Sequence, residues 1–516
     1  MVLIVLIIFA SLLRYPFAVK AEDKEYVIGT DFYAPLEGPM PQKGVPFSDT
    51  NFHTTIVRLT DRAEYRDPGI ENEYSKTDPE NCDGTLVILR GNTGEWYLYD
   101  MTTYAMKKLF GSWFFDGVEP EPKWSTTDPK VLYYLYETEL RTCNVNTDAS
   151  ALVHDFSSDF PQASYITTGS EGNPSLDQRY WSFLVKDSDF NLISAVVYNK
   201  QTNSIIGHRE SFPDMVEDIS MDMSGNHCMI GFDSHVFQIC SKDFHTIRDL
   251  PTGANGHNDF ALTTNHKDIL VYQNTQTDYV CMTDLETLTE TPLIQIPFTV
   301  NPDIGLHFSG NCAQKPGWVL VSTYGAKYPP PSASHSWMDT QLFMLQLQQN
   351  PTVWRIAHTH SYTSNEYTGE KNYFAEAFAT INNAGSRAYF GSNWGDLTAD
   401  YTDTYQVTIP SEWNAVAPGF TPSATSTPTS KPTTTPTHMP SPEPTTPTLF
   451  ESRLEILWLV GIGALAAAVC IAIYLMRRKN KNRSYEIDKD DGTVTFSDGE
   501  KGSAPPSARW NRMKGE

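Results

Sequence analysis

A short pattern of apolar and polar positions repeats along most of the chain. In residues 280–293, VCMTDLETLTETPL, an alternating apolar run ends at Asp284, a polar turn follows, and a second short run ends at Leu293. Alternation with a period of two is typical of strands with one buried face, and Asp and Thr suit the turn between them. Related phrases recur around Asp100, Asn144, Asn199, Ser241 and, more loosely, Gln346. The pattern therefore predicts a repeated pair of antiparallel strands.

A second set of strands is marked by apolar runs that each follow a polar turn. Their aliphatic, β-branched and aromatic residues are typical of strands buried on both faces. The runs lie at 85–89, 131–136, 180–185, 227–232, 269–272, 318–322 and 388–392. Repeats of about 40 to 45 residues with four strands each form the blades of β-propellers. We therefore predict an all-β fold with a seven-bladed β-propeller over residues 54–412.

The last predicted blade is one strand short. Residues 403–410, DTYQVTIP, end the repeats after three strands, whereas the strand-like segment 54–60, TTIVRLT, has no partner in its own neighbourhood. Pairing these two segments would complete the blade and remove both exposed sheet edges. The sequence therefore predicts that the two ends of this domain pair with each other.

The segments outside the repeats indicate secretion and membrane anchoring. Residues 1–21 have the apolar core and small cleavage-site residues of a signal peptide, and residues 22–53 form an irregular segment. Residues 413–455 are rich in Thr, Ser and Pro, which is typical of an extended, O-glycosylated stalk. The apolar stretch 456–476 can cross a membrane as one helix, and the basic residues after it favour a cytoplasmic, disordered tail at 477–516. We therefore predict a single-pass type I protein of the cell membrane with an extracellular propeller.

Charge and cysteine spacing limit the possible partners and cross-links. The formal net charge of −24 argues against binding to nucleic acid, whose phosphates need a basic face. Residues 228–240 resemble a hairpin that places Cys228 opposite Cys240, so we predict a disulfide between these two. For the other extracellular cysteines we expect unpaired burial as small apolar side chains. These are Cys82, Cys143, Cys281 and Cys312.

Potential metal ligands lie where the innermost strands of three consecutive blades are expected to begin. In a propeller these positions converge on the central channel. They carry His257 and Asp259, His307, and Glu376. Two imidazoles and two carboxylates would suit Mn²⁺ or a similar divalent cation better than Ca²⁺, which prefers oxygen ligands alone. The alternative is that these side chains hydrogen bond to ordered water in the channel.

Two further groups of residues are candidates for ligand binding. The insertion at 327–337 carries Tyr328 and Trp337, and aromatic residues on loops commonly contact sugars or proteins. His358 and His360 are separated by one residue at a strand end, a spacing that can chelate a metal. The alternatives are a loop that folds over its blade and buries the Trp, and two surface histidines.

Two turn-and-strand units carry a resemblance to known proteins. SMDMSGNHCMIGF at 220–232 and TINNAGSRAYFGSNWG at 380–395 resemble the repeat phrase of TolB-like and WD-repeat-like propellers. The blade order and the FGSNWG tract are similar to the seven-bladed propellers that include the oligogalacturonate lyases. That resemblance implies a manganese ion in the channel, held largely by histidines, with a His-x-His pair at the start of a late blade. In this chain Glu376 and Phe378 stand where that pair is expected.

Two classes of function are consistent with these features. One is a cell-surface recognition or adhesion protein, whose extracellular propeller binds a glycan or a protein partner. The alternative is a membrane-anchored, metal-dependent polysaccharide lyase of the oligogalacturonate lyase type. The channel positions offer several acids and few basic groups, which would repel a polyuronate. The sequence also contains no serine-hydrolase elbow, phosphate-binding glycine loop or HExxH motif, so whether the chain is catalytic is left open.

Overall fold

The computed structural model describes residues 26–36, 38–64, 67–111, 114, 119–328, 335–365, 372–397 and 402–410, and the short stretches 485–487, 494–496 and 501–502. The chain divides into two compact units, residues 1–422 and 423–516. The predicted signal peptide, stalk and membrane helix lie outside the described residues. Within the described ranges, no helix has both the length and the apolar character needed to cross a membrane.

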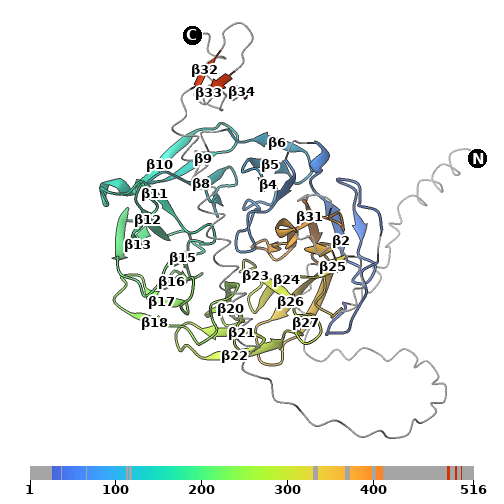
Figure 1. Cartoon of the computed structure of the whole chain (residues 1–516). Helices are drawn as coiled ribbons and strands as arrows, with labels where there is room; N and C mark the ends of the chain where they lie inside the picture. The colour runs from blue at the N-terminus through green and yellow to red at the C-terminus, as the bar shows by residue number, and fades with distance from the viewer. Residues whose placement is uncertain are drawn as a thin grey trace, which may run out of the picture. The chain divides into compact units, whose positions relative to one another are not determined.

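The first unit contains five antiparallel sheets of four strands each, arranged around a common centre (Figure 1). The first sheet consists of β7 (Lys123–Trp124), β8 (Val131–Tyr136), β9 (Glu139–Asn144) and β10 (Ser150–Asp155). The second consists of β11 (Tyr165–Thr167), β12 (Tyr180–Lys186), β13 (Leu192–Asn199) and β14 (Ser204–Arg209), and the third of β15 (Val216–Met221), β16 (His227–Phe232), β17 (Gln238–Ser241) and β18 (Ile247–Asp249). The fourth consists of β19 (Asn258–Leu262), β20 (Asp268–Asn274), β21 (Tyr279–Asp284) and β22 (Glu290–Gln295), and the fifth of β23 (Gly305–Ser309), β24 (Trp318–Tyr324), β26 (Gln341–Gln346) and β27 (Val353–His358).

A sixth, nine-stranded sheet completes the ring and includes both ends of the domain. One stretch of it is β3 (Gly69–Glu71), β4 (Leu86–Gly91), β5 (Trp96–Asp100) and β6 (Met106–Leu109). The other is β29 (Thr380–Ile381), β30 (Arg387–Ser392), β31 (Thr402–Thr408), β2 (Thr55–Arg58) and β1 (Phe47–Ser48). A short parallel pairing of β3 with β31 joins the two stretches.

The remaining elements of this unit are short. β25 (Lys327–Tyr328) and β28 (Ser364–Asn365) form a two-stranded parallel pair. The described 3-10 helices are η1 (Arg62–Glu64), η2 (Phe156–Ser158) and η3 (Tyr373–Ala375). The predicted all-β class is therefore confirmed.

The apolar runs that follow polar turns all form strands, each second from the centre of the ring. They are β4, β8, β12, β16, β20, β24 and β30. Apolar side chains from both faces of these strands pack between neighbouring sheets. Val271 and Val280 of the fourth sheet, for example, share one buried cluster with Val319 and Phe343 of the fifth. Because a neighbouring sheet covers each face, these strands are continuously apolar and do not alternate.

The two ends of the domain pair as the sequence predicts. β2 runs antiparallel to β31, with Thr55 opposite Thr408 and Arg58 opposite Tyr405. β31 also pairs with β30, so the strand from the N-terminal end occupies the position after the last strand of the repeats. The outer edge of β31 is thereby covered, as is usual for closed ring folds.

The N-terminal segment, predicted to be irregular, lies along the outer strand of the fifth sheet. The Gly29 N–H donates to the Val353 carbonyl at 2.8 Å, and the Arg355 N–H donates to the Val27 carbonyl at 2.8 Å. These bonds cover the exposed edge of β27, which would otherwise leave backbone groups open to pairing with another chain.

The predicted disulfide between Cys228 and Cys240 is not formed. The register does place these residues directly opposite each other on β16 and β17, but both carry free, buried thiols. Burial raises the pKa of the Cys240 thiol to about 11 and that of Cys228 well above its ordinary value. Thiol–disulfide exchange proceeds through the thiolate, so these buried, protonated thiols react slowly.

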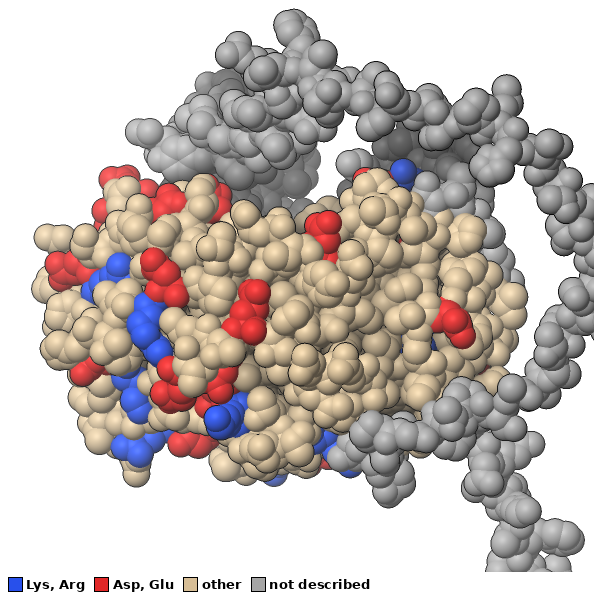
Figure 2. Space-filling view, turned by 90° about the horizontal axis from the view of Figure 1, so that it is seen from below, with Lys and Arg blue, Asp and Glu red and all other residues tan. Residues whose placement is uncertain are grey.

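Charged side chains are mixed on the visible described surface. Figure 2 shows Lys and Arg interspersed with Asp and Glu toward one side of that face, while much of the rest carries neither.

In the second unit, β32 (Tyr485–Ile487), β33 (Val494–Phe496) and β34 (Lys501–Gly502) form a small antiparallel sheet. This sheet lies within the tail that we expect to be disordered, so local strand pairing is present there.

Candidate functional site

A bulge in the innermost strand of the nine-stranded sheet enters the central channel. Glu71 pairs with Arg90, and the next pairing joins Glu80 to Val87. Residues 72–79 on one strand thus face only residues 88–89 on the other. An insertion of this size cannot stay in the ladder and must leave the plane of the sheet. We call residues 72–79 the channel segment.

Side chains from three separate sheets hold the channel segment. The amides of Asn173 and Asn311 both donate to the Lys76 carbonyl, at 2.7 Å and 3.0 Å. The Thr380 hydroxyl donates to the Thr77 carbonyl at 2.9 Å. Asn173 precedes β12, Asn311 follows β23 and Thr380 lies in β29, so these bonds converge on the segment from different sides of the ring. The segment therefore fills the middle of the channel.

The Lys76 ammonium provides a buried positive charge there. Its Nζ lies 2.7 Å from a carboxylate oxygen of Glu171 and 3.5 Å from one of Asp218. Burial alone would lower the pKa of Lys76, but these two carboxylates outweigh that effect and raise it. Lys76 is therefore cationic at neutral pH and neutralises part of the acidic channel.

Several carboxyl groups around the channel segment are held close to neutral. Burial raises the pKa of Glu71 to about 8 and the pKa values of Glu73 and Asp259 to about 7. Asp259 accepts hydrogen bonds from the backbone N–H groups of Phe260 and Gly310. These groups carry less negative charge at pH 7 than their number suggests, because a buried carboxylate is poorly solvated.

Imidazole and aromatic rings line one end of the channel. The rings of His257 and His307 stack with their centroids 4.4 Å apart, and Tyr324 stacks on the His307 ring at 5.0 Å. Tyr74 and Phe378 contact the same ring at 5.4 Å and 4.7 Å. Together with Glu376 and Tyr373, these residues are called the histidine mouth. Tyr373 is 64% exposed, whereas His307 and Phe378 are buried, so solvent reaches this group of rings at Tyr373.

Glu376 and His307 form the polar centre of the histidine mouth. Nε2 of His307 lies 3.1 Å from Oε2 of Glu376. Burial raises the pKa of Glu376 to about 7, whereas burial, reinforced by the charges of His257 and Lys76, lowers the pKa of His307 well below its usual range. The imidazole is therefore neutral at pH 7, and the carboxyl group is close to its midpoint. Such a pair can exchange a proton with a bound ligand, because both states of Glu376 are populated near neutrality.

Similarity to known proteins is limited to structure. No protein-family model matches the sequence, and no curated protein matches it. An oligogalacturonate lyase from Vibrio parahaemolyticus is 13% identical, with a TM-score of 0.49 over 72% of this chain and 97% of the other. An oligogalacturonate lyase in complex with manganese is also 13% identical, with a TM-score of 0.49 over 75% and 98% of the two chains. The WD40 repeats of RRP9 are 8% identical, with a TM-score of 0.40 over 71% and 100%.

The chain has a β-propeller fold. Its sheets and their pairing order are those of propeller blades.

The predicted metal ligands come together only in part. His257, His307 and Glu376 meet at the histidine mouth, whereas the carboxylate of Asp259 is engaged by backbone N–H groups. The Nδ1–H of His257 donates to the Leu306 carbonyl at 2.7 Å, which leaves Nε2 as the nitrogen of this ring that carries a lone pair. Among the described residues, no group of three or more His, Cys, Asp or Glu is arranged to hold a metal ion. The four predicted ligands therefore do not gather around one point in the described part of the chain.

The other predicted ligand-binding residues are structural, as far as they are described. Trp337 packs against the core with the Arg355 guanidinium 5.0 Å from its ring, so it is not displayed on an exposed loop. His358 is buried and its Nε2 is hydrogen-bonded to the Tyr33 carbonyl at 2.9 Å. His360 stacks on Trp394 at 4.2 Å, and burial lowers its pKa to about 4. The side chain of Tyr328 lies outside the described residues.

Sequence reasoning missed the channel segment and the aromatic half of the histidine mouth. The segment lies in the polar sequence NEYSKTDPE at 72–80, which resembles an ordinary loop. One signal was available. The stretch from Gly69 to Leu86 is longer than one innermost strand and one turn require, since strands usually have about 5 to 6 residues.

Proposed function

We propose that this chain is a cell-surface, single-pass membrane protein whose extracellular propeller binds a glycan at the histidine mouth. The two stretches of the nine-stranded sheet each have the strand order of a blade, which supports a count of seven blades with β2 completing the last. The apolar stretch 456–476 and the Thr-, Ser- and Pro-rich stretch 413–455 support anchoring and a stalk. Protease treatment of intact cells would test the orientation, since the propeller should be accessible and the tail protected.

The observation that carries the proposal is the ring of aromatic groups around a polar centre. Tyr74, Tyr324, Tyr373 and Phe378 surround His307 and Glu376. Aromatic faces pack against the apolar faces of sugar rings, and a few polar groups then fix the orientation of the ligand. This combination is typical of a site for small, polar, ring-shaped ligands.

The charge of the site favours neutral or amino sugars over uronates. Glu171 and Glu376 lie near the mouth, while the Lys76 ammonium is buried behind it and paired with carboxylates. An anionic ligand would meet like charge, which disfavours binding. A glycan array probed with the full-length chain in detergent tests this. We expect binding to neutral or amino-sugar glycans, and selective binding to polyuronates would contradict the proposal.

A second candidate function is an enzyme that acts on a carbohydrate. Glu376 beside His307 favours it, because a carboxyl group with a pKa of about 7 can both accept and donate a proton near neutral pH. Incubation of the bound glycans with the full chain, followed by product analysis, separates the two candidates. Cleavage that is lost in Glu376→Gln while binding persists would establish the enzyme, and unchanged glycan would leave recognition as the function.

A further inference from the structure

A cavity of about 220 Å³ lies at the end of the channel opposite the histidine mouth. It is formed where the innermost strands end and turn toward the second strands, and its lining includes residues that follow β23 and β29. We call it the turn-side cavity. We propose that it is a second binding site, for an uncharged, hydroxyl-rich ligand about the size of one sugar ring. The volume is slightly below the roughly 300 Å³ at which ligand pockets usually begin, which suits a single ring.

The lining combines amide groups with an apolar wall. Asn173, Asn311, Asn382 and Asn383 contribute amides, while Met221, Met223, Leu176 and Trp124 contribute apolar surface. An amide can both donate and accept hydrogen bonds, as a hydroxyl group does. The Asn382 amide is already engaged by Glu80, Ser386 and Arg387, so Asn383 is the amide on which ligand binding would depend most. A ligand with hydroxyl groups at its edge and an apolar face matches such a lining.

The charged residues at the cavity are already neutralised by the protein. Glu80 accepts two bonds from the Arg387 guanidinium, at 2.7 Å and 2.5 Å. The Lys123 ammonium donates to the Thr77 hydroxyl at 2.7 Å and lies 3.6 Å from Glu73. Because these charges have partners, the cavity offers no free ion to attract a charged ligand.

Asp78, another acid that lines the cavity, is weakly charged. Asp78 accepts hydrogen bonds from the backbone N–H groups of Glu80 and Asn383, at 3.0 Å and 2.9 Å. Burial, followed by the nearby charge of Glu80, nevertheless raises the pKa of Asp78 to about 8. At neutral pH this side chain is largely a neutral carboxylic acid, which can donate a hydrogen bond to a hydroxyl oxygen.

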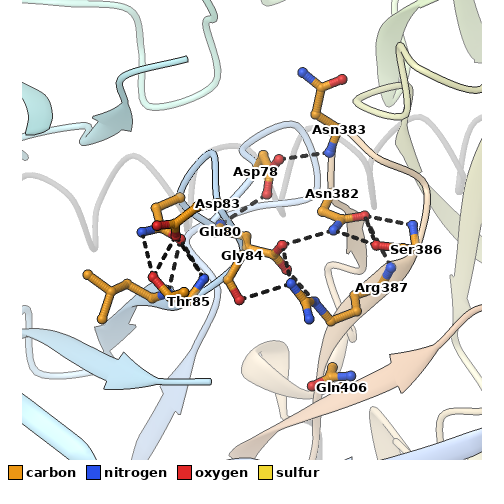
Figure 3. Close-up of polar contacts among 12 residues, drawn as sticks. Asp78, Glu80, Asp83, Gly84, Thr85, Asn382, Asn383, Ser386, Arg387 and Gln406 are labelled. Carbon is orange, nitrogen blue, oxygen red and sulfur yellow. Dashed lines mark hydrogen bonds and ion pairs between the residues drawn. The ribbon is translucent and has the colours of Figure 1, made fainter. Parts of the chain in front are cut away.

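Asn383 provides a polar atom that lacks a hydrogen-bond partner among the described residues. Its Oδ1 atom is buried and accepts no hydrogen bond from any described residue. Figure 3 shows the Asn383 side chain directed away from the hydrogen-bonded cluster of Asn382, Ser386 and Arg387. A buried acceptor without a donor is unfavourable by itself. A ligand hydroxyl in the cavity would satisfy it.

The turn-side cavity is separate from the histidine mouth. The channel segment lies between them, fixed through the Lys76 and Thr77 carbonyls. Occupancy of the cavity can therefore be measured independently of the mouth. Cys82 provides the probe, because it lines the cavity and is exposed, whereas the other cysteines of the described ranges are buried.

The test measures how fast N-ethylmaleimide alkylates Cys82 in the full-length chain. Mass spectrometry of the peptide that contains Cys82 gives the rate. The probes are glucose, galactose, mannose, xylose and N-acetylglucosamine, with galacturonate and glucosamine as charged counterparts. We expect at least one neutral sugar to slow the reaction several-fold, and its charged counterparts to have no effect. The proposal would be overturned if every neutral sugar left the alkylation rate equal to the rate without sugar. It would also be overturned if the charged sugars slowed the reaction as much as the neutral ones.

Two substitutions locate the protection. Asn383→Leu removes the unsatisfied amide, and Leu176→Trp fills the cavity from a position that is 36% exposed and tolerant of a larger side chain. Both should abolish protection, while Asn265→Leu in an exposed turn should keep it. Tyr373→Ala at the opposite mouth should also keep it, which separates failure of this proposal from failure of the proposed function. Protection that persists in either cavity variant would contradict the assignment.

Discussion

Arg58 and Asp403 form a buried ion pair between the first and last parts of the propeller. Nη2 of Arg58 lies 2.8 Å from Oδ2 of Asp403, and the side chains are 9% and 0% exposed. The other carboxylate oxygen accepts from the Thr60 hydroxyl at 3.0 Å and from the Arg62 backbone N–H at 2.8 Å. Every oxygen of the carboxylate therefore has a donor from the N-terminal end of the domain. The closure of the ring rests on this contact in addition to the pairing of β2 with β31.

Replacing Arg58 by Met should destabilise the propeller by about 3–5 kcal/mol, because Asp403 would remain buried without its counter-charge. The free energy of unfolding in urea measures this. The matched control is Lys107→Met, which removes an exposed ion pair with Asp100 and should cost about 1 kcal/mol or less. Similar effects of the two substitutions would show that the closure does not depend on the buried pair.

The stability of the propeller should decrease as the pH rises from about 5 to 8. The pKa of Glu71 is about 8 in the folded chain and 4.5 ordinarily, so the folded state binds the extra proton in this interval. The free energy of unfolding then falls with pH, by up to about 1.4 kcal/mol per pH unit for one such group. Glu71→Gln should flatten the profile, whereas Glu286→Gln at an exposed site should not. Unfolding in urea at several pH values measures both slopes, and an unchanged slope in Glu71→Gln would contradict this account.

Lys76→Met should destabilise the chain by roughly 3–5 kcal/mol at pH 8, because Glu171 and Asp218 would lose their buried counter-charge. The loss should be smaller at pH 5, because burial raises the pKa of Asp218 to about 6 and protonation then removes its charge. Thermal melts at the two pH values measure the difference. Lys267→Met, in an exposed pair with Asp284, is the control and should have little effect at either pH. A pH-independent loss in Lys76→Met would show that packing, not charge, fixes the channel segment.

Treatment with a chelator should leave the melting temperature unchanged. The described His, Cys, Asp and Glu side chains form no group of three or more that could hold a metal ion. Metal analysis of the purified chain should give much less than one equivalent. The conclusion would be refuted if the wild-type chain held one equivalent of manganese and the His257→Ala and His307→Ala variants lost it. The control variant His208→Ala, at an exposed position, should then keep the metal.

The strands could be predicted because their signals are local. A run such as VLYYLY at 131–136 is apolar throughout since neighbouring sheets cover both its faces, and the polar turn before it marks its start. The partner of residues 54–60 could also be inferred. The last blade lacks one strand and 54–60 is the one strand without a neighbour, so the two must pair.

The candidate site was predictable only in part because its contacts join residues distant in sequence. His257, His307 and Glu376 could be placed from their positions at strand starts. Tyr74 reaches them through a bulge that no periodicity reveals. The sequence left open whether Trp337 and His358 face solvent, because a ring has the same sequence pattern in either case. Trp337 packs beside Arg355, and His358, the last residue of β27, packs beside Phe52.

The central claim is that the histidine mouth binds the ligand, and the most direct test is the affinity of the full-length Tyr373→Ala variant for a glycan that the wild-type chain binds. Tyr373 is exposed at the mouth, so its removal should not disturb the fold. We expect the Kd to increase about fivefold or more, which corresponds to the roughly 1 kcal/mol of one aromatic contact. Phe190→Ala, which removes an exposed aromatic ring elsewhere, should leave the Kd unchanged. Equal affinity of Tyr373→Ala and the wild-type chain would contradict the claim and move recognition to another surface.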